Sequence, residues 1–258
     1  MKTLSISTAT ENLSVAVNNG IETLAERNIV DQRNHSVNII PTIEAVLAQS
    51  NLKLTEIEQI AVAAGPGSYT GLRIGITTAK VMGERLGVKL VGVSTLAALA
   101  ANMTPAGTKA ELTVALLDAR NDNFFAGAYR LDSASKSSGP AVVLSDAHVA
   151  LEHLLELVQE MLRQYNFTRV NFVGDFTPEH AAKIKDQLLS TDVELHFGTD
   201  QENLVHAGQI GWIAEFSTPV SPAELLPRYL RKTQAEVEWE NRTGAKSLKD
   251  DSKYVEEV

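Results

Sequence analysis

The chain has 258 residues, carries 23 Lys and Arg against 32 Asp and Glu, and contains no cysteine. The absence of cysteine excludes a disulfide scaffold, a cysteine-ligated zinc site and a thiol nucleophile. The whole net charge of −9 lies in residues 101–258, because residues 1–100 carry eight basic and eight acidic side chains. A protein that grips nucleic acid with its own surface usually has a basic face, and no long stretch of this chain is basic.

The first residues do not resemble a targeting segment. Residues 1–7 read Met-Lys-Thr-Leu-Ser-Ile-Ser, which looks like a strand and lacks the apolar run of a signal peptide. Nowhere do about 18 apolar residues follow one another, so we expect no transmembrane helix and a cytoplasmic location. With 44% apolar residues, the chain is expected to fold as one large domain or two lobes.

Alternating apolar and polar residues predict three strands at the start, at about 4–6, 13–17 and 21–29. Asn18-Asn19-Gly20 is typical of the hairpin turn between the last two. In residues 35–50 the apolar positions recur at three- and four-residue spacing, which predicts a helix. Pro41 either kinks this helix or begins its regular part.

Helices and strands then alternate to the middle of the chain. Ser94 is expected to be the N-cap of a short helix. The predicted elements are a strand within 55–64, a helix from the 65–71 loop to about Leu86, a strand at 89–93 and a helix at 95–102.

The same order of elements starts again after residues 105–107. The prediction is for strands at 112–117 and 124–131, a turn at 133–139, a strand near 141–143, a helix at 147–165, a strand at 170–173, a helix at 178–189, a strand at 193–197 and a last helix at 203–216.

Two halves of related order indicate an α/β protein with two actin-like, ribonuclease-H-type lobes, each a mixed sheet flanked by helices. We expect a partner-binding N-terminal lobe at 1–104 and a C-terminal lobe at 105–231. The helix at 203–216 could pack back toward the first lobe. The last 27 residues, 232–258, hold 12 charged side chains and are expected to form a mobile tail.

No metal site or nucleophile can be assembled from residue spacing. His148 and His153 are five residues apart, so on a helix they would point about 140° apart. No histidine pair has the three- or four-residue spacing of a helical metal site. Ser68 is not in a Gly-x-Ser-x-Gly elbow, which favours a turn or cap serine. We therefore predict no catalytic residue and no metal ligand.

The loop Gly65-Pro66-Gly67-Ser68-Tyr69-Thr70-Gly71 follows a strand and opens a helix. This geometry turns backbone N–H groups toward an anion. However, the loop is neither a Walker sequence nor Gly-x-Gly-x-x-Gly. A phosphate-binding loop and a purely structural turn both remain possible interpretations.

Hydroxyl residues stand where an actin-like ATPase presents a carboxylate to magnesium and phosphate. They are Ser7, Thr8 and Thr10, in the turn after the first strand. Hydroxyls hold Mg²⁺ poorly compared with a carboxylate. Asp118 ends the first strand of the second half and is the fourth candidate for this degenerate nucleotide cleft. The alternative for Asp118 is a salt-bridged turn.

Small residues recur every four positions in the second predicted helix. Each glycine inside a helix costs about 1 kcal/mol relative to alanine, so a backbone is expected to pass close to this stripe. That backbone belongs either to the sheet of the same lobe or to a helix of a partner chain. The second possibility predicts an interface formed by Ile39, Ile40, Ile43, Leu47, Gly71, Leu72, Gly75, Ile76, Ala79 and Gly83.

Taken together, these segments resemble the TsaB (YeaZ) family. Residues 1–120 carry most of the similarity, and residues 130–225 match weakly. One departure is Ser7, where many relatives carry Asp. The matching segments are residues 4–17, His35-Ser36 with Pro41, residues 64–79, 93–96 and 118–120, and the end of the folded part at 227–231.

The resemblance implies a non-catalytic subunit in the synthesis of threonylcarbamoyladenosine (t6A) on tRNA. Family members pair with the catalytic paralogue TsaD through helices of the first lobe, and form homodimers through the same helices. The ATPase TsaE joins them in bacteria. TsaD transfers the threonylcarbamoyl group to N6 of adenosine 37 in tRNAs that read codons beginning with A.

The resemblance further implies that this chain binds no cofactor firmly, since ATP and Mg²⁺ belong to the partner complex. It would meet tRNA only through that complex and would not contact a membrane. Two other classes stay open. One is an actin-like kinase or ATPase acting on its own, with Ser7, Thr8, Thr10 and Asp118 around the phosphates. The other is a hydrolase or peptidase, for which no nucleophile–base pair is found.

Overall fold

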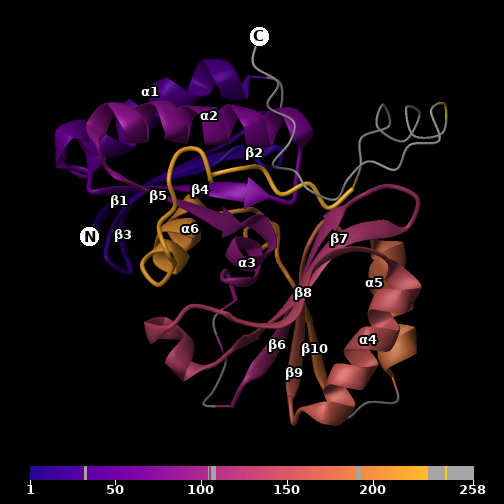
Figure 1. The fold of residues 1–258 in the computed structure, drawn as a ribbon. Coiled ribbons are helices and arrows are strands. Elements are labelled where there is room, and N and C mark those ends of the chain that lie inside the picture. The colour runs from indigo at the N-terminus through magenta and orange to yellow at the C-terminus, as the bar shows by residue number, and fades with distance from the viewer. Residues whose placement is uncertain (32–33, 104, 106–108, 190–192, 232–241, 243–258) are drawn as a thin grey trace.

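The computed structural model describes residues 1–31, 34–103, 105, 109–189, 193–231 and 242 of the chain. These residues form two lobes, each built on a five-stranded sheet with helices against it (Figure 1). The predicted tail at 232–258 lies outside the described residues except for Arg242. In the described part, no helix combines the length and the apolar character needed to cross a bilayer.

The sheet of the first lobe has β1 at its centre. Strand β1 is antiparallel to β2 and parallel to β4, and the order is β3-β2-β1-β4-β5. Every residue of β4 is buried, as expected for a parallel strand with both faces covered. The five strands are β1 (Lys2–Ser7), β2 (Asn12–Asn19), β3 (Glu22–Val30), β4 (Gln59–Gly65) and β5 (Lys89–Ser94).

The sheet of the second lobe repeats this arrangement. Its order is β10-β9-β6-β7-β8, with β6 antiparallel to β7 and parallel to β9. Two lobes with this mixed topology form the actin-like, ribonuclease-H-type architecture, which confirms the predicted fold class. The strands are β6 (Glu111–Asp118), β7 (Asn123–Leu131), β8 (Ala141–Ala150), β9 (Arg169–Gly174) and β10 (Glu194–Phe197).

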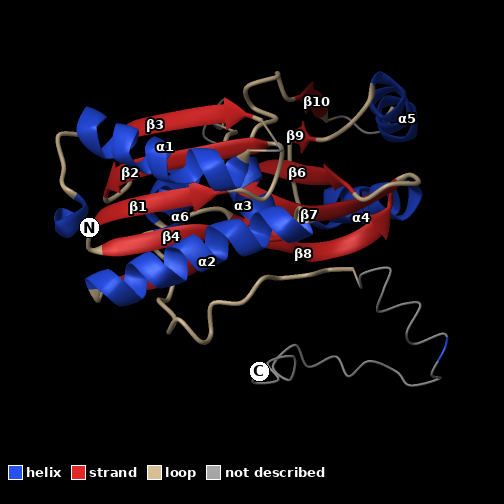
Figure 2. Ribbon diagram, turned by 90° about the horizontal axis from the view of Figure 1, so that it is seen from above, coloured by secondary structure: helices blue, strands red, loops and turns tan. Residues whose placement is uncertain are grey.

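Helices α1 (His35–Gln49) and α2 (Tyr69–Leu86) lie side by side on one face of the first sheet (Figure 2). Helix α1 begins at His35 and runs through Pro41, so the helix does not begin at the proline. Both helices bury an apolar face against the sheet, in a cluster with residues such as Leu4, Ile6 and Val62. Their opposite faces point away from the lobe.

Helix α6 (Ala207–Ala214) follows the second sheet in the sequence but packs on β1, β2 and β3 of the first lobe. It therefore covers the face opposite to α1 and α2 (Figure 1). The approach is close, because a Cβ at Gly211 would lie 2.2 Å from Oδ1 of Asn18. Helix α3 (Thr95–Ala100) contacts strands of both lobes, and the Ser94 hydroxyl caps it by accepting from the backbone N–H of Ala97.

The outer side of the second sheet carries α4 (Leu151–Gln164) and α5 (Pro178–Leu188) (Figure 1). They pack with β6, β7 and β9 in an apolar cluster that contains Phe172 and Leu154. Two short 3₁₀ turns, Leu54–Glu56 and Ser133–Ser137, complete the described elements.

Two predicted boundaries were wrong. Residues 147–150 were expected in a helix, but they extend β8, where His148 pairs with Phe125 and Ala150 with Asn123. Residues 203–206 were expected in the last helix, but α6 begins only at Ala207. The side chain of Asn203 instead bonds to the backbone of Gly174 and Gly198, which fixes a turn.

Candidate functional site

A cleft of about 840 Å³ lies between the lobes. Residues 9–12 and 67–68 of the first lobe line one side of it. Residues of the β6–β7 turn and the segment after β9 line the other side. The Ser68 hydroxyl accepts from the N–H of Gly71, so this serine is the N-cap of α2.

Of the four residues predicted for this cleft, Thr10 and Asp118 line it. The prediction was wrong for Ser7 and Thr8, which are buried, with 0% and 1% of their surface exposed. The Thr8 hydroxyl donates to the carbonyl oxygen of Gly71 at 2.6 Å, so it ties the turn to α2. Neither Ser7 nor Thr8 lines the cleft.

Asp118 has a partner that sequence reasoning missed. Asp175 follows β9, and because β9 runs parallel to β6, both carboxyl ends meet at the same edge of the sheet. Oδ2 of Asp175 accepts from the backbone N–H of Asp118 at 3.1 Å. The sequence offered one signal for Asp175, because this residue lies just after the buried strand predicted at 170–173.

Burial raises the pKa of the Asp175 carboxyl. Partial desolvation by the surrounding protein atoms is the larger cause, and the negative charges of Asp118 and Glu11 add to it. Asp118 also accepts from the N–H of Arg120 at 2.8 Å, which stabilises the turn after β6. Both carboxylates line the cleft, where they give it local negative charge. Nevertheless, within the described ranges no group of three or more histidine, cysteine or acidic side chains could hold a metal ion.

The stripe of small residues on α2 faces the sheet of its own lobe. A Cβ at Gly71 would lie 2.0 Å from the carbonyl oxygen of Thr8, and one at Gly75 would lie 2.5 Å from the Thr8 hydroxyl. At Gly83 it would meet Leu90 at 2.4 Å. The structure thus supports the first of the two explanations for the stripe, close packing on the same lobe.

The predicted interface residues are therefore mostly unavailable to another protein. Ile40 is 48% exposed, whereas the other nine are buried. The buried nine are Ile39, Ile43, Leu47, Gly71, Leu72, Gly75, Ile76, Ala79 and Gly83. The prediction that these side chains contact a partner was wrong, because the apolar faces that periodicity detects are the faces turned to the sheet.

The outer faces of the same two helices carry apolar side chains in solvent. Val37 and Ile40 of α1 are 68% and 48% exposed, and Val81 of α2 is 61% exposed. These three residues, named here the outer helix face, lie on adjacent helices of the first lobe (Figure 2). Contiguous exposed apolar surface is typical of protein interaction sites, whereas single exposed apolar side chains are common on any protein.

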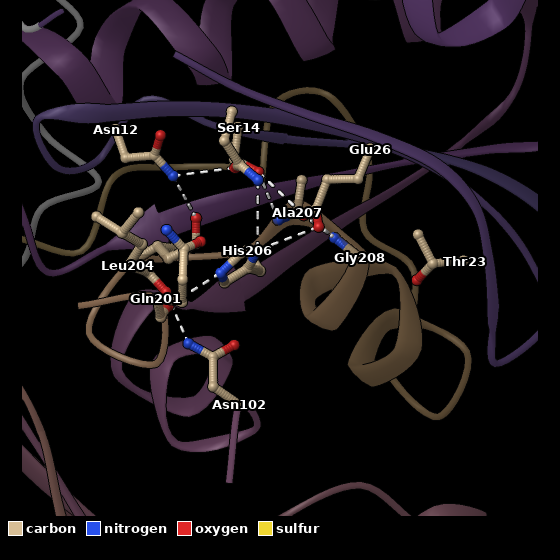
Figure 3. A network of polar contacts seen from close by, with 12 residues as sticks. Asn12, Ser14, Thr23, Glu26, Asn102, Gln201, Leu204, His206, Ala207 and Gly208 are labelled. Carbon is tan, nitrogen blue, oxygen red and sulfur yellow. Dashed lines mark hydrogen bonds and ion pairs between the residues drawn. The ribbon is translucent and has the colours of Figure 1, made fainter. Parts of the chain in front are cut away.

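A polar network joins the first sheet to α6 and the turn before it (Figure 3). His206 Nδ1 lies 3.1 Å from Glu26 Oε2, and the N–H of Gly208 donates to Glu26 at 3.0 Å. Asn12 adds a bond from its amide to the carbonyl of Val205 at 3.0 Å. These contacts fix α6 and the turn before it on the first sheet.

The ion pair in this network shifts two pKa values. The hydrogen bond to Glu26 raises the pKa of His206, against the opposing effect of burial. Burial alone would raise the pKa of Glu26, but the hydrogen bonds from His206 and Gly208 outweigh it and lower that pKa.

Two lobes of one repeated topology, with a cleft between them, define an actin-like protein. The family model described as "TsaD: tRNA N6-adenosine threonylcarbamoyltransferase" matches residues 23–239. The "tRNA threonylcarbamoyladenosine biosynthesis protein TsaB" of Bacillus subtilis is 30% identical over 240 residues, which cover 93% of this chain and 98% of that protein. The chain belongs to the TsaB (YeaZ) family, as the resemblance predicted.

Further relatives agree with this assignment. The TsaB protein of Escherichia coli is 35% identical over 132 residues, 51% of this chain and 56% of that protein. The solved structure of YeaZ from Pseudomonas aeruginosa superposes with a TM-score of 0.69 at 24% identity, covering 88% of this chain and 99% of that one. The structural match supports the fold.

Proposed function

We propose that this chain is a non-catalytic subunit of the machinery that makes t6A on tRNA. In this proposal it binds a TsaD-type catalytic subunit, which transfers the threonylcarbamoyl group to N6 of adenosine 37 in tRNAs reading ANN codons. A TsaE-type ATPase joins the complex, and the chain acts in the cytoplasm. The names of the TsaB relatives support a place in this synthesis.

The outer helix face is the observation that carries the proposal. Val37, Ile40 and Val81 expose apolar surface on α1 and α2, and burying it against another protein would contribute about 25 cal/mol per Å². We propose that the catalytic subunit covers this face, and that a second copy of the chain covers it when the catalytic subunit is absent.

The cleft supports a role without independent catalysis. Two of the hydroxyls that would replace a metal-binding carboxylate are buried and bonded within the fold. We propose that the chain holds no cofactor firmly and that ATP and Mg²⁺ belong to the partner complex.

The alternative is an actin-like kinase or ATPase that acts alone. The carboxyl pair of Asp118 and Asp175 in a cleft between two lobes is the observation that favours it. This alternative requires magnesium-dependent nucleotide turnover by the isolated chain. Titration calorimetry with millimolar ATP and Mg²⁺ decides the point, and binding with turnover would replace the proposed role.

Co-purification tests the outer helix face. We expect Val81→Glu to abolish or strongly weaken co-purification with the catalytic subunit, because a charge would be buried in the interface. Val142→Glu is the matched control, since Val142 on β8 is also a valine with 61% exposure but lies on the second lobe. Equal recovery of the catalytic subunit with both variants would contradict the assignment of this face.

A further inference from the structure

The segment that leaves α6 crosses from the first lobe to the second. It is named here the strap, residues 220–231 (the yellow segment of Figure 1). Val220 forms a bridge with Leu90, and the N–H of Arg228 donates to the carbonyl of Ala64. Nη1 of Arg231 then donates to the carbonyl of Ala119 at 2.9 Å, on the second lobe.

The strap meets α2 through a cluster of two tyrosines and an arginine. The rings of Tyr69 and Tyr229 stack with centroids 4.8 Å apart. The Arg73 guanidinium lies 4.2 Å from the centre of the Tyr69 ring, and its Nε donates to the Tyr229 hydroxyl at 3.1 Å. Arg73 is exposed, yet its guanidinium is held in one place by both tyrosines.

Two more arginines flank Tyr229 along the strap, and their charged ends face the second lobe, where Arg228 acts on Tyr129 and Arg231 bonds to Ala119. Arg228 and Arg231 are one and two residues from Tyr229, so their Cα atoms lie within about 7 Å of it. Both are exposed. The basic patch is defined as Tyr69, Arg73, Arg228, Tyr229 and Arg231.

The positive charges of the patch are not neutralised within the described part of the chain. There, no carboxylate lies within ion-pair distance of Arg73, Arg228 or Arg231, whereas Arg130 and Arg163 have carboxylate partners. Arginine is the residue best suited to bind phosphate, because its planar donors match two phosphate oxygens. Three guanidinium groups without a carboxylate partner among the described residues form a local exception to the acidic character of a chain of net charge −9.

We propose that the basic patch contacts phosphate groups of the tRNA backbone. The inference rests on the proposed function, which supplies the identity of the polyanion. The acidic balance of the whole chain predicts that tRNA is met only through the complex. The patch adds a direct contact at one face, and the remaining acidic surface would keep the RNA from other faces.

Salt-dependent tRNA binding by the isolated full-length chain tests this proposal. Fluorescence anisotropy with labelled tRNA, between about 50 and 200 mM salt, gives the slope of log K against log salt. Each phosphate contact contributes roughly 0.7–0.9 to that slope. We therefore expect the triple variant Arg73→Gln, Arg228→Gln and Arg231→Gln to reduce the magnitude of this slope by about 2–3. Its tRNA binding should be about 100-fold weaker than that of wild type near 0.1 M salt.

Two further triple variants separate charge at this place from net charge and from misfolding. Arg27→Gln, Arg85→Gln and Lys89→Gln remove the same charge from exposed positions outside the patch and are expected to keep most of the affinity. Arg73→Lys, Arg228→Lys and Arg231→Lys keep the charge and are expected to keep the slope. The proposal would be overturned if the glutamine variant of the patch bound tRNA as tightly as the variant of Arg27, Arg85 and Lys89. It would also be overturned if tRNA binding by the wild-type chain did not depend on salt.

The patch could instead serve an acidic protein surface. In that case the glutamine variant would lose co-purification with the catalytic subunit while its tRNA binding stayed unchanged, and the RNA proposal would be wrong. Failure of the proposed function would give a different result: the wild-type chain would neither bind the catalytic subunit nor support t6A formation.

Discussion

At Gly71 the fold leaves no room for a side chain. The Cβ of an alanine would lie 2.0 Å from the carbonyl oxygen of Thr8, so the backbone of the β1–β2 turn would have to move. We expect Gly71→Ala to lower the free energy of unfolding by about 1–3 kcal/mol, although alanine is the better helix former by about 1 kcal/mol.

Urea denaturation measures this change. Thr77→Ala, on the exposed side of the same helix, is the control and should stay within about 0.5 kcal/mol of wild type. If Gly71→Ala is as stable as wild type, α2 does not pack on the turn as described.

The pair of His206 and Glu26 makes stability depend on pH. The pKa of His206 is raised above its ordinary value of 6.5, so its contribution is full below that pH and is lost as the pH rises through the raised value. The pKa of Glu26 is lowered below 4.5, so its contribution is present above that pH and is lost as the pH falls through the lowered value. The pair stabilises most between the two ordinary values.

We therefore expect the stability difference between wild type and His206→Gln to be largest between pH 4.5 and 6.5 and to shrink at alkaline pH. Urea denaturation at a series of pH values measures it. His153→Gln is the control, because His153 pairs with Glu156 in solvent, where such pairs contribute little. A constant difference for His206→Gln across this range would show that the ion pair is not formed.

Only two of the four residues predicted for the cleft, Thr10 and Asp118, line it. Asp118 could be placed because a strand end at a sheet edge is a general position for polar groups. Ser7 and Thr8 could not, because a hydroxyl that bonds to the backbone inside the fold has the same local sequence as one that faces a ligand. Asp175 needed the pairing of β6 with β9, which is a contact between distant segments.

Helix α6 completes the core of the first lobe. It comes from the C-terminal part of the chain yet covers β1, β2 and β3, and residues such as Ile210 are fully buried there. We expect a fragment of residues 1–104 to fail to fold, because it would leave one face of its sheet in water.

Circular dichroism and amide NMR dispersion of the fragment check this expectation, with residues 1–231 as the folded control. A cooperative, well-dispersed 1–104 fragment would show that α6 is not part of the lobe's core.

The elements themselves were largely predictable, and their ends were not. Alternation and helical spacing located the strands and helices because burial of one face imposes those periods. Residues 147–150 were misassigned because a strand and the helix that follows it share apolar positions there, and only pairing with β7 separates them. Similarly, the helical spacing of apolar residues located α2, but this spacing does not show which apolar face a partner would cover.

For the whole molecule, the sequence could indicate two lobes of related order, since the order of elements repeats. It could not indicate how the lobes are joined. That depends on long-range contacts such as Arg231 to Ala119, and on the network of His206 and Glu26. The strap and α6 bind the C-terminal part of the chain back onto the first lobe, so the lobes are expected to act as one scaffold for a partner on α1 and α2.

We propose that this chain is needed for t6A synthesis through contact at the outer helix face. The most direct measurement is t6A formation on tRNA by the purified TsaD-type and TsaE-type partners, with threonylcarbamoyl-adenylate, assayed with wild-type chain, with Val81→Glu, with Val142→Glu and without the chain. We predict modification with wild type and Val142→Glu, and strongly reduced modification with Val81→Glu and without the chain. Full modification in the absence of the chain would show that the chain is not needed, and equal modification with both variants would show that the outer helix face is not the contact.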